Sequence, residues 1–289
     1  EGEIIKMFRR SVVYLLQIYY RSGIRGSWRV SDFLSKRYQS LHSIPIEVDG
    51  GILYGDLRIG SARGILASPK SQSGEDNLMT EFVRAGDAVF DVGAHLGLYT
   101  LLLSKLVASD GKVFAFEPNP ELLPCLRRTV ESHKNIELFE IALSDENGEI
   151  ELFVPEDASM GSLSNWTKGI AGSVHSVRCE MKILDEIFAR GEIDLPSFIK
   201  CDVEGAELSV FSGARQILDR VDAPVVLFEL NKKAVESFGH KTSDYLEFFT
   251  SLKQPNYTFL EVLPAGTQTM QNWDVDYTNV LAVPASRLK

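Results

Sequence analysis

The stretch that decides the fold reads Ala88-Val-Phe-Asp91-Val-Gly93-Ala-His95-Leu-Gly97-Leu-Tyr99-Thr100. It begins as a short apolar strand, passes through a turn with two glycines and continues directly as a helix. In doubly wound α/β folds, this order of elements holds a nucleotide-like ligand at the carboxyl end of a strand. Gly93 and Gly97 remove side chains where a ligand or the next helix must come close.

Apolar runs alternate with helical periodicity along the rest of this half of the chain. The predicted strands are Ala88–Val92, Lys112–Glu117, Ile136–Ile141, Phe198–Val203, Val225–Leu230, Tyr257–Leu263 and Thr278–Val283. The predicted helices between them are Leu98–Val107, Glu121–Ser132, Ala206–Asp219 and Ser243–Leu252. Short apolar strands separated by helices indicate an α/β fold with a mostly parallel sheet covered on both faces.

A long insertion, residues 144–196, separates the third strand from the fourth. Asp145-Glu-Asn-Gly148 predicts a hairpin turn before the run Glu149–Val154. Ala158–Gly172 is rich in Ser, Gly and Asn, which predicts either a mobile segment or a functional lid. The side chains that we expect to line an acceptor pocket here are Phe153, Met160 and Trp166, and His175 is the histidine best placed to touch a substrate.

The first 70 residues form an accessory region, and the main domain spans 71–289. Residues 3–21 have the periodicity of an amphipathic helix with basic flanks, and 22–42 give a weaker helical stretch. Ile44–Ala67 shows short alternating runs punctuated by glycine, which predict a small antiparallel sheet. We expect the first helix to pack on its own domain; contact with a membrane or a partner is the alternative.

Composition limits the function classes. The 289 residues are 44% hydrophobic with a net charge of −10, which fits a soluble globular protein and disfavours a nucleic-acid binder. Residues 1–40 differ, because they hold eight basic and three acidic side chains. Cys125, Cys179 and Cys201 lie far apart, which favours reduced thiols in the cytoplasm and no zinc site. A peripheral position at the membrane is the alternative localisation.

Two acids at predicted strand ends indicate which ligand binds. Asp91 stands where a dinucleotide fold would place its first glycine, and a carboxylate repels a pyrophosphate but attracts the amino group and sulfonium of S-adenosylmethionine. Glu117 ends the second strand, 26 residues later, where an acid accepts both ribose hydroxyls in NAD and S-adenosylmethionine sites alike. The pair favours S-adenosylmethionine, and an NAD-dependent oxidoreductase remains a rival.

A second acidic turn follows the fourth strand, at Lys200-Cys-Asp202-Val-Glu204-Gly205-Ala-Glu207. Acids gathered at one sheet end are costly unless something positive lies there. We expect the first and fourth strands to be neighbours, so Asp202 should face the ligand held near Asp91. Glu207 is expected to favour the first turn of the next helix.

Together, these segments resemble an FkbM-type S-adenosylmethionine-dependent methyltransferase over residues 85–285. The matching segments are Asp91–Gly97, Phe116–Pro120, Ala142–Asp145, Lys200–Glu207, Gly213-Ala214 and Phe228–Leu230. The resemblance implies a class I, Rossmann-like, seven-stranded sheet in the order 3-2-1-4-5-7-6, and O-methylation of a hydroxyl on a sugar, a polyketide or a lipid-linked glycan. His95 stands where the family usually has Asn.

The predicted cofactor residues combine the two turns with this resemblance. They are Asp91, Gly93, His95, Gly97, Tyr99, Thr100, Glu117, Pro118, Asn119, Ala142, Leu143, Ser144 and Asp202. The resemblance implies that Asp91, Gly93 and Gly97 shape the methionine pocket, that Glu117 holds the ribose and that Ala142–Ser144 border the adenine.

The predicted catalytic acids are Asp202, Glu204 and Glu229, with Asp202 or Glu204 as the base or its orienting partner. No metal is favoured, although Asp202, Glu229 and Asn231 are an alternative set of ligands for Mg²⁺. A non-catalytic binding module with the same fold is a further rival.

Overall fold

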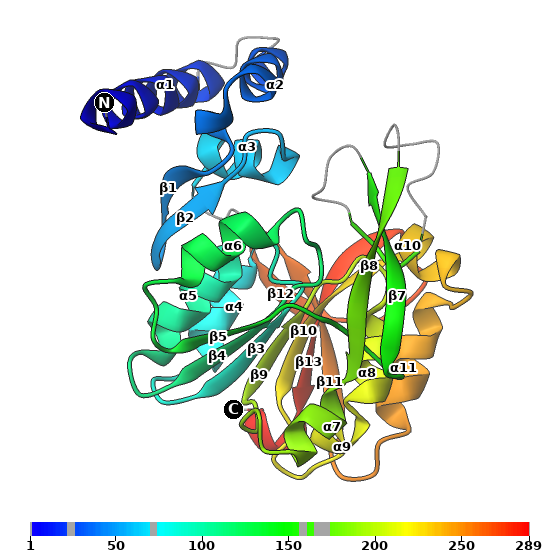
Figure 1. Cartoon of the computed structure of the whole chain (residues 1–289). Helices are drawn as coiled ribbons and strands as arrows, with labels where there is room; N and C mark the ends of the chain where they lie inside the picture. Colours follow the sequence, from blue (N-terminus) through cyan, green and yellow to red (C-terminus); the bar gives the residue numbers. More distant parts are fainter. Residues whose placement is uncertain (1, 22–26, 70–73, 156–160, 165–173, 289) are drawn as a thin grey trace.

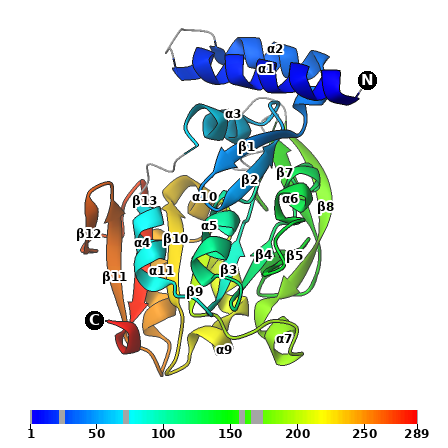
Figure 2. The same cartoon turned by 90° about the vertical axis from the view of Figure 1, so that its left-hand side faces the viewer.

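The computed structural model describes residues 2–21, 27–69, 74–155, 161–164 and 174–288. Figures 1 and 2 show a twisted central sheet with helices on both faces and a smaller sheet beside it. The N-terminal helices lie at one end of the molecule, and the C-terminus lies at the opposite end. Among the described helices, none is both long and apolar enough to cross a bilayer.

The central sheet has eight strands within the described residues, in the order β12-β11-β13-β10-β9-β3-β4-β5. Its parallel strands are β3 (Ala88–Val92), β4 (Lys112–Phe116), β5 (Ile136–Phe139), β9 (Phe198–Cys201) and β10 (Val225–Asn231). Antiparallel pairing adds β13 (Tyr277–Pro284), β11 (Tyr257–Leu263) and β12 (Gly266–Thr269). If β12 is left out and the other seven strands are numbered 1 to 7 along the chain, their order across the sheet, starting at β5, is 3-2-1-4-5-7-6.

The described central sheet has one strand more than the seven that were expected, and the additional strand is β12. β12 reads Gly-Thr-Gln-Thr, and all four residues are exposed, so it carries no apolar alternation that could have revealed it. Among the described strands, β11 is its one partner, at the edge of the sheet.

Helices cover both faces of this sheet because its strands are apolar on both sides. In β3, Val89 and Phe90 lie in separate core clusters on opposite faces. The helices that follow the accessory region are α4 (Glu75–Phe82), α5 (Leu98–Val107), α6 (Leu123–Val130), α7 (Leu184–Ala189), α8 (Glu207–Gly213), α9 (Arg215–Leu218), α10 (Lys232–Ser237) and α11 (Thr242–Thr250). A 3₁₀ turn, Ala285–Arg287, ends the described chain.

The insertion forms a second sheet. The prediction of a hairpin turn at Asp145–Gly148 is wrong. This sheet has the order β6-β8-β7, made of β6 (Ala142–Ser144), β8 (Val174–Ile183) and β7 (Gly148–Pro155). Asp145–Gly148 joins β6 to β7, but the two strands do not pair with each other, because β8 lies between them. β8 is parallel to β6 and antiparallel to β7, so the long return strand replaces the local pairing.

Two predicted elements are divided differently in the structure. The single helix expected over Ala206–Asp219 is interrupted after Gly213, and α8 and α9 form instead. A side chain at Gly213 would place its Cβ 2.0 Å from the carbonyl oxygen of Ser144, so glycine permits the close approach of α8 to β6. The strand predicted to Ile141 ends at Phe139, and Ala142 begins the other sheet.

The accessory region is helical at both ends of its small sheet. Its elements are α1 (Gly2–Arg21), α2 (Ser27–Arg37), the 3₁₀ turn Gln39–Leu41, β1 (Ile44–Val48), β2 (Gly51–Gly55) and α3 (Gly60–Ala67). β1 and β2 form the expected antiparallel pair, but the last part of the predicted sheet is helix α3. Ile44 and Leu53 share a hydrophobic core with Leu96 and Leu101 of the main domain.

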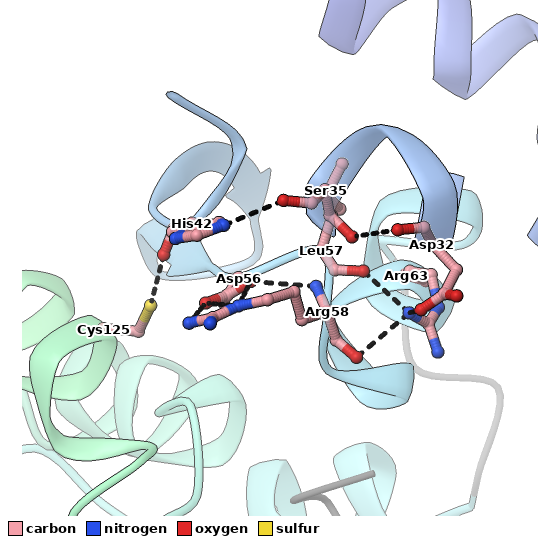
Figure 3. Close-up of polar contacts among 8 residues, drawn as sticks. All are labelled: Asp32, Ser35, His42, Asp56, Leu57, Arg58, Arg63 and Cys125. Carbon is pink, nitrogen blue, oxygen red and sulfur yellow. Dashed lines mark hydrogen bonds and ion pairs between the residues drawn. The ribbon is translucent and has the colours of Figure 1, made fainter. Parts of the chain in front are cut away.

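Polar contacts also connect the accessory region to the main domain (Figure 3). The thiol of Cys125 in α6 donates to the carbonyl oxygen of His42 at 3.4 Å, and the His42 ring contacts the Ser35 carbonyl at 2.8 Å. Arg63 donates to the Leu57 carbonyl at 2.7 Å within the same segment. The first of these bonds joins the residue after the 3₁₀ turn to α6, and the last holds the turn between β2 and α3.

Candidate active site

A pocket opens at the carboxyl ends of β3, β4 and β9, where ligands bind in this class of fold. The apolar part of the lining comes from β3, β4, the residue before α6, and the second sheet with the residue before it: Val92, Phe116, Leu122, Ile141, Ala142, Leu143 and Leu152. The rest of the lining is made by Gly93, His95, Glu117, Pro118, Asn119, Gly161, Ser162, Leu163, Asp202, Val203, Glu204 and Ala206. The described lining therefore includes three carboxyl groups and no lysine or arginine.

Gly93 brings the β3 turn against the β9 turn. Its φ of 81° is in the left-handed region, and its amide donates to the Phe116 carbonyl at 2.9 Å. An added Cβ would lie 1.9 Å from the carbonyl oxygen of Asp202. Only glycine fits this position without moving one of the two turns that form the pocket floor.

Glu117 holds two turns together from the end of β4. Its two carboxylate oxygens accept the backbone N–H groups of His95 and Asn119, each at 2.8 Å. Burial raises the pKa of Glu117 to about 7, against the opposing effect of these two hydrogen bonds. Each oxygen retains a further lone pair that can accept a ligand hydroxyl from the pocket.

Asp91 is buried in β3, directly before the lining residues Val92 and Gly93. One of its oxygens accepts the hydroxyl of Thr100 at 2.5 Å, and the other, Oδ1, is buried and has no hydrogen-bond partner. Burial raises the pKa of Asp91, although the nearby cation of Lys200 opposes this effect. A buried, half-satisfied carboxyl group at this position favours a positively charged ligand above it.

Lys200 supplies the positive charge between the two acidic turns. It lies opposite Asp91 in the β3–β9 register, and its Nζ donates to Asp202 Oδ2 at 3.1 Å. Burial alone would lower the pKa of Lys200, but the carboxylates of Asp202 and Asp91 raise it above its ordinary value. Its ammonium group also lies 4.8 Å from the centre of the Tyr99 ring. Lys200 therefore stays charged and orients Asp202.

Glu204 occupies a strained turn at the mouth of the pocket. Its φ of 56° is in the left-handed region, although it is not glycine. Burial, together with the carboxylates of Glu229 and Asp202, raises the pKa of Glu204 to about 9. This carboxyl group is therefore mostly protonated at neutral pH without a ligand.

Glu207 organises the turn rather than facing a ligand. Its Oε1 accepts the backbone N–H groups of Val203 at 3.0 Å and Gly205 at 3.3 Å, and its Oε2 accepts the hydroxyl of Tyr245 at 3.1 Å. The structure thus places it at the start of α8, as expected for an acid in a first helical turn.

The structure sorts the predicted cofactor residues into two groups. Those that line the pocket are Gly93, His95, Glu117, Pro118, Asn119, Ala142, Leu143 and Asp202, together with the predicted catalytic Glu204. Those outside its lining are Asp91, Gly97, Tyr99, Thr100 and Ser144. Thr100 supports Asp91, and the Tyr99 hydroxyl donates to Glu75. At Gly97, an added Cβ would lie 3.0 Å from Leu126 and Thr129 in α6.

Glu229 lies one strand further along the sheet and does not line the pocket. Its carboxylate accepts the Tyr277 hydroxyl at 3.0 Å, and burial, with the charge of Asp202 adding to it, raises its pKa to about 8. The Asn231 side chain caps α10 by accepting the Ala234 amide at 3.4 Å. Across the described ranges, no group of three or more His, Cys, Asp or Glu side chains is arranged to hold a metal ion.

Two contacts at the pocket gave little signal in the sequence. Ser162 reaches the pocket from the insertion, and its hydroxyl donates to the Glu204 carbonyl at 2.9 Å. Its backbone pairs with Phe153 at 2.8 and 3.0 Å, so Gly161–Ser164 folds back onto β7. The His95 ring lies 3.3 Å from the Ser61 hydroxyl in α3, which brings the accessory region to the pocket. No motif predicts either contact.

The remaining acceptor candidates have different outcomes. His175 pairs with Glu121 at 2.7 Å on the surface, and about half of its side chain is exposed. Met160, Trp166 and most of the predicted lid 158–172 lie outside the described residues.

Fold and pocket together define a class I methyltransferase domain. The Methyltransferase FkbM domain model matches residues 91–259, and the chain belongs to this family. The match begins at Asp91 and contains both acidic turns and the insertion.

Two curated relatives are methyltransferases. The chain is 29% identical over 150 residues to the hexuronic acid methyltransferase AglP of Haloferax volcanii, which covers 52% of this chain and 59% of AglP. It is 23% identical over 175 residues to the 2-O-methyltransferase NoeI of Sinorhizobium fredii, which covers 55% of this chain and 70% of NoeI. The match to AglP thus spans less than two thirds of that protein.

Solved structures with a similar fold include a putative rRNA-methylase from Clostridium thermocellum, at 13% identity and a TM-score of 0.43, covering 73% of this chain and 93% of that chain. A SAM-dependent methyltransferase from Aquifex aeolicus is similar at 16% identity and a TM-score of 0.42, covering 73% of this chain and 89% of that chain.

Proposed function

We propose that this protein is an S-adenosylmethionine-dependent O-methyltransferase whose acceptor is a sugar hydroxyl. The observation that carries the proposal is the pocket at the ends of β3, β4 and β9, whose lining combines an apolar group of residues with the acids Asp202 and Glu204. An apolar wall suits an adenine ring, and carboxylates suit a sulfonium and an amino group.

The residues present fit this cofactor. The adenine would lie between Phe116, Ala142 and Leu143, and Glu117 would accept the ribose hydroxyls with its remaining lone pairs. The amino group would lie above the β3 turn, where the unpartnered Oδ1 of Asp91 is buried just below. When bound, S-adenosylmethionine supplies the methyl group, and its sulfur keeps the electron pair of the broken carbon–sulfur bond.

The chain's own contribution to transfer is alignment and proton removal. A sugar hydroxyl is a weak nucleophile until its proton is taken, and a carboxylate at the pocket mouth can accept that proton. The side chain of Asp202 pairs with the buried ammonium group of Lys200 and is 39% exposed. Glu204 has a raised pKa that a neighbouring cation would lower toward neutrality. Glu204 therefore serves as the base, and Asp202 orients the hydroxyl.

The sugar class of the acceptor is supported by the two relatives, since AglP is named for a hexuronic acid and NoeI for a 2-O position. The insertion adds Ser162 and Leu163 to the pocket lining, and the Ser162 hydroxyl lies beside Glu204, where an acceptor could contact it. Sugar hydroxyls form directional hydrogen bonds with such carboxyl and hydroxyl groups.

The test is transfer of a labelled methyl group from S-adenosylmethionine to a panel of neutral and acidic sugars, followed by mass spectrometry. We expect the mass of one methyl group to be added to a sugar. Glu204→Gln should lower kcat by about 10² or more, with cofactor affinity largely kept. Glu192→Gln, an exposed acid paired with Arg190 far from the pocket, is the matched control and should transfer normally.

The rivals give different results in the same assay. A non-catalytic binding module would bind S-adenosylmethionine but add no methyl group to any sugar. An NAD-dependent oxidoreductase would bind NAD and not S-adenosylmethionine in calorimetry. Either result would overturn the proposed function.

A further inference from the structure

The N-terminal helices α1 and α2 carry an apolar surface that the rest of the described chain leaves uncovered. On α1 the exposed apolar side chains are Tyr14, Leu15 and Ile18, of which Leu15 is 63% exposed. On α2 they are Val30 and Phe33, and Phe33 is 69% exposed. We call these five residues the N-terminal apolar face. Because α1 and α2 contact each other, these exposed apolar side chains lie on neighbouring helices, which is typical of an interaction surface.

Within residues 11–20, where the structure describes its side chains, α1 has one buried apolar side and one exposed apolar side. Its buried residues are Val13, Leu16 and Tyr20, which join the hydrophobic core of the accessory region with Ala62 and Leu66 of α3. At 100° per residue, this buried set and the exposed set Tyr14, Leu15 and Ile18 lie on opposite sides of the helix. The exposed apolar residues are therefore separate from the residues that pack into the core.

α2 combines its exposed apolar residues with positive charge. Arg29, Lys36 and Arg37 are exposed on the same side of the helix as Val30 and Phe33, as their spacing requires. The buried positions Ser31 and Ser35 lie on the other side. A helix side with aromatic and aliphatic groups among basic ones is typical of helices that lie in the interface of a membrane.

Charge separates this region from the rest of the chain. Residues 1–40 hold eight basic and three acidic side chains, a net charge of +5, while the remainder holds 22 basic and 37 acidic side chains, a net charge of −15. An anionic surface would attract the first 40 residues and repel the body of the protein. The charge distribution thus selects both the partner and the end of the molecule that approaches it.

The location of the helices adds to this argument. Figure 1 shows α1 and α2 at the same end of the molecule as the tips of β7 and β8, while α7, α9 and the C-terminus lie at the other end. The accessory region also reaches the pocket, because the Ser61 hydroxyl in α3 lies 3.3 Å from the ring of His95, a lining residue. A surface bound by the helices would lie on the side of the pocket mouth.

We propose that the N-terminal apolar face binds the surface of an anionic lipid bilayer, with α1 and α2 lying in the headgroup region and the basic residues contacting lipid phosphates. The apolar side chains supply insertion and the positive charge supplies attraction, and stable binding of this kind needs both. This proposal concerns location and does not depend on the proposed chemistry.

The test is co-sedimentation of the full chain with vesicles of equal parts phosphatidylglycerol and phosphatidylcholine, and with vesicles of phosphatidylcholine alone. We expect binding to the mixed vesicles that weakens in high salt, and much weaker binding to phosphatidylcholine. The double substitution Leu15→Glu with Phe33→Glu should lower the partition coefficient by about tenfold or more, because two inserted side chains become charged. Val221→Glu, at a 69% exposed site in the loop after α9, is the matched control and should bind as wild type.

Folding and self-association are controlled in the same experiment. Thermal unfolding without vesicles should be the same for wild type and the double variant, because both substituted side chains are exposed. If the double variant unfolds at a lower temperature, the double variant Leu15→Ser with Phe33→Ser is used instead. Equal binding by wild type and the folded double variant would overturn the proposal. Failure of the wild type to bind the mixed vesicles would also overturn it. One form of that failure is a dimer, seen by light scattering and abolished in the double variant, in which a second copy covers the N-terminal apolar face.

Discussion

Gly93→Ala tests the claim that the β3 and β9 turns must touch to build the pocket. An alanine Cβ there would meet the Asp202 carbonyl oxygen at 1.9 Å, and the backbone would hold a φ of 81°. The left-handed conformation alone costs about 1 kcal/mol for a residue with a Cβ. Displacing a packed backbone atom adds about 1–3 kcal/mol. We therefore expect a total loss of about 3 kcal/mol in unfolding free energy.

Gly86→Ala is the matched control for conformational strain. Gly86 has a similar φ of 88°, but nothing lies within 4 Å of its added Cβ. It should therefore lose only the conformational part, about 1 kcal/mol.

The assay is urea unfolding of both variants, followed by calorimetry with S-adenosylmethionine. Gly93→Ala should also weaken cofactor binding, because Asp202 moves with its carbonyl group, while Gly86→Ala should bind as wild type. If the two variants unfold with the same free energy, or if Gly93→Ala binds the cofactor normally, the contact between the two turns is not what shapes the pocket.

Two further predictions concern charge. Glu204 has a pKa raised from 4.5 to about 9, so the native state binds its proton more tightly than the unfolded state does. The unfolding free energy should therefore fall as pH rises through this interval. Glu204→Gln should flatten that fall in denaturation measured from pH 5 to pH 9, and an unchanged slope would contradict the assignment. Lys200→Met should lower the unfolding free energy by about 3–5 kcal/mol, because it leaves Asp91 and Asp202 without their buried counterion; a loss below about 1 kcal/mol in urea unfolding would show that Lys200 does not neutralise them.

Much of the fold was predictable because local patterns agree with tertiary structure in the central sheet. β3 and β9 are short apolar runs that end in glycine-bearing turns, and each occurs close to its expected position. The insertion was less predictable. Asp145–Gly148 has the composition of a hairpin turn, but β8 starts 26 residues after Gly148 and pairs with both neighbouring strands. A long-range partner overrides a local signal, and no window of sequence contains that information.

The candidate site was predictable to the extent that it depends on residues next to strand ends. Glu117 and Asp202 line the pocket because they follow β4 and β9 directly. The role of Lys200 was less apparent in the sequence. Its pairing with the acids depends on the register of β9 against β3, which places it opposite Asp91. The positive φ of Glu204 also has no sequence signature, because the residue is not glycine. Ser162 reaches the pocket through a fold-back of the insertion that no motif encodes.

A crystal structure of the protein with S-adenosylhomocysteine tests the central claim most directly. We predict density for the adenine beside Ala142 and Leu143, ribose hydroxyls within hydrogen-bond distance of the Glu117 carboxylate, and the sulfur on the side of Asp202 and Glu204. Nucleoside density in any other part of the molecule, or a Glu117 carboxylate without contact to the ribose, would contradict the assignment of this pocket.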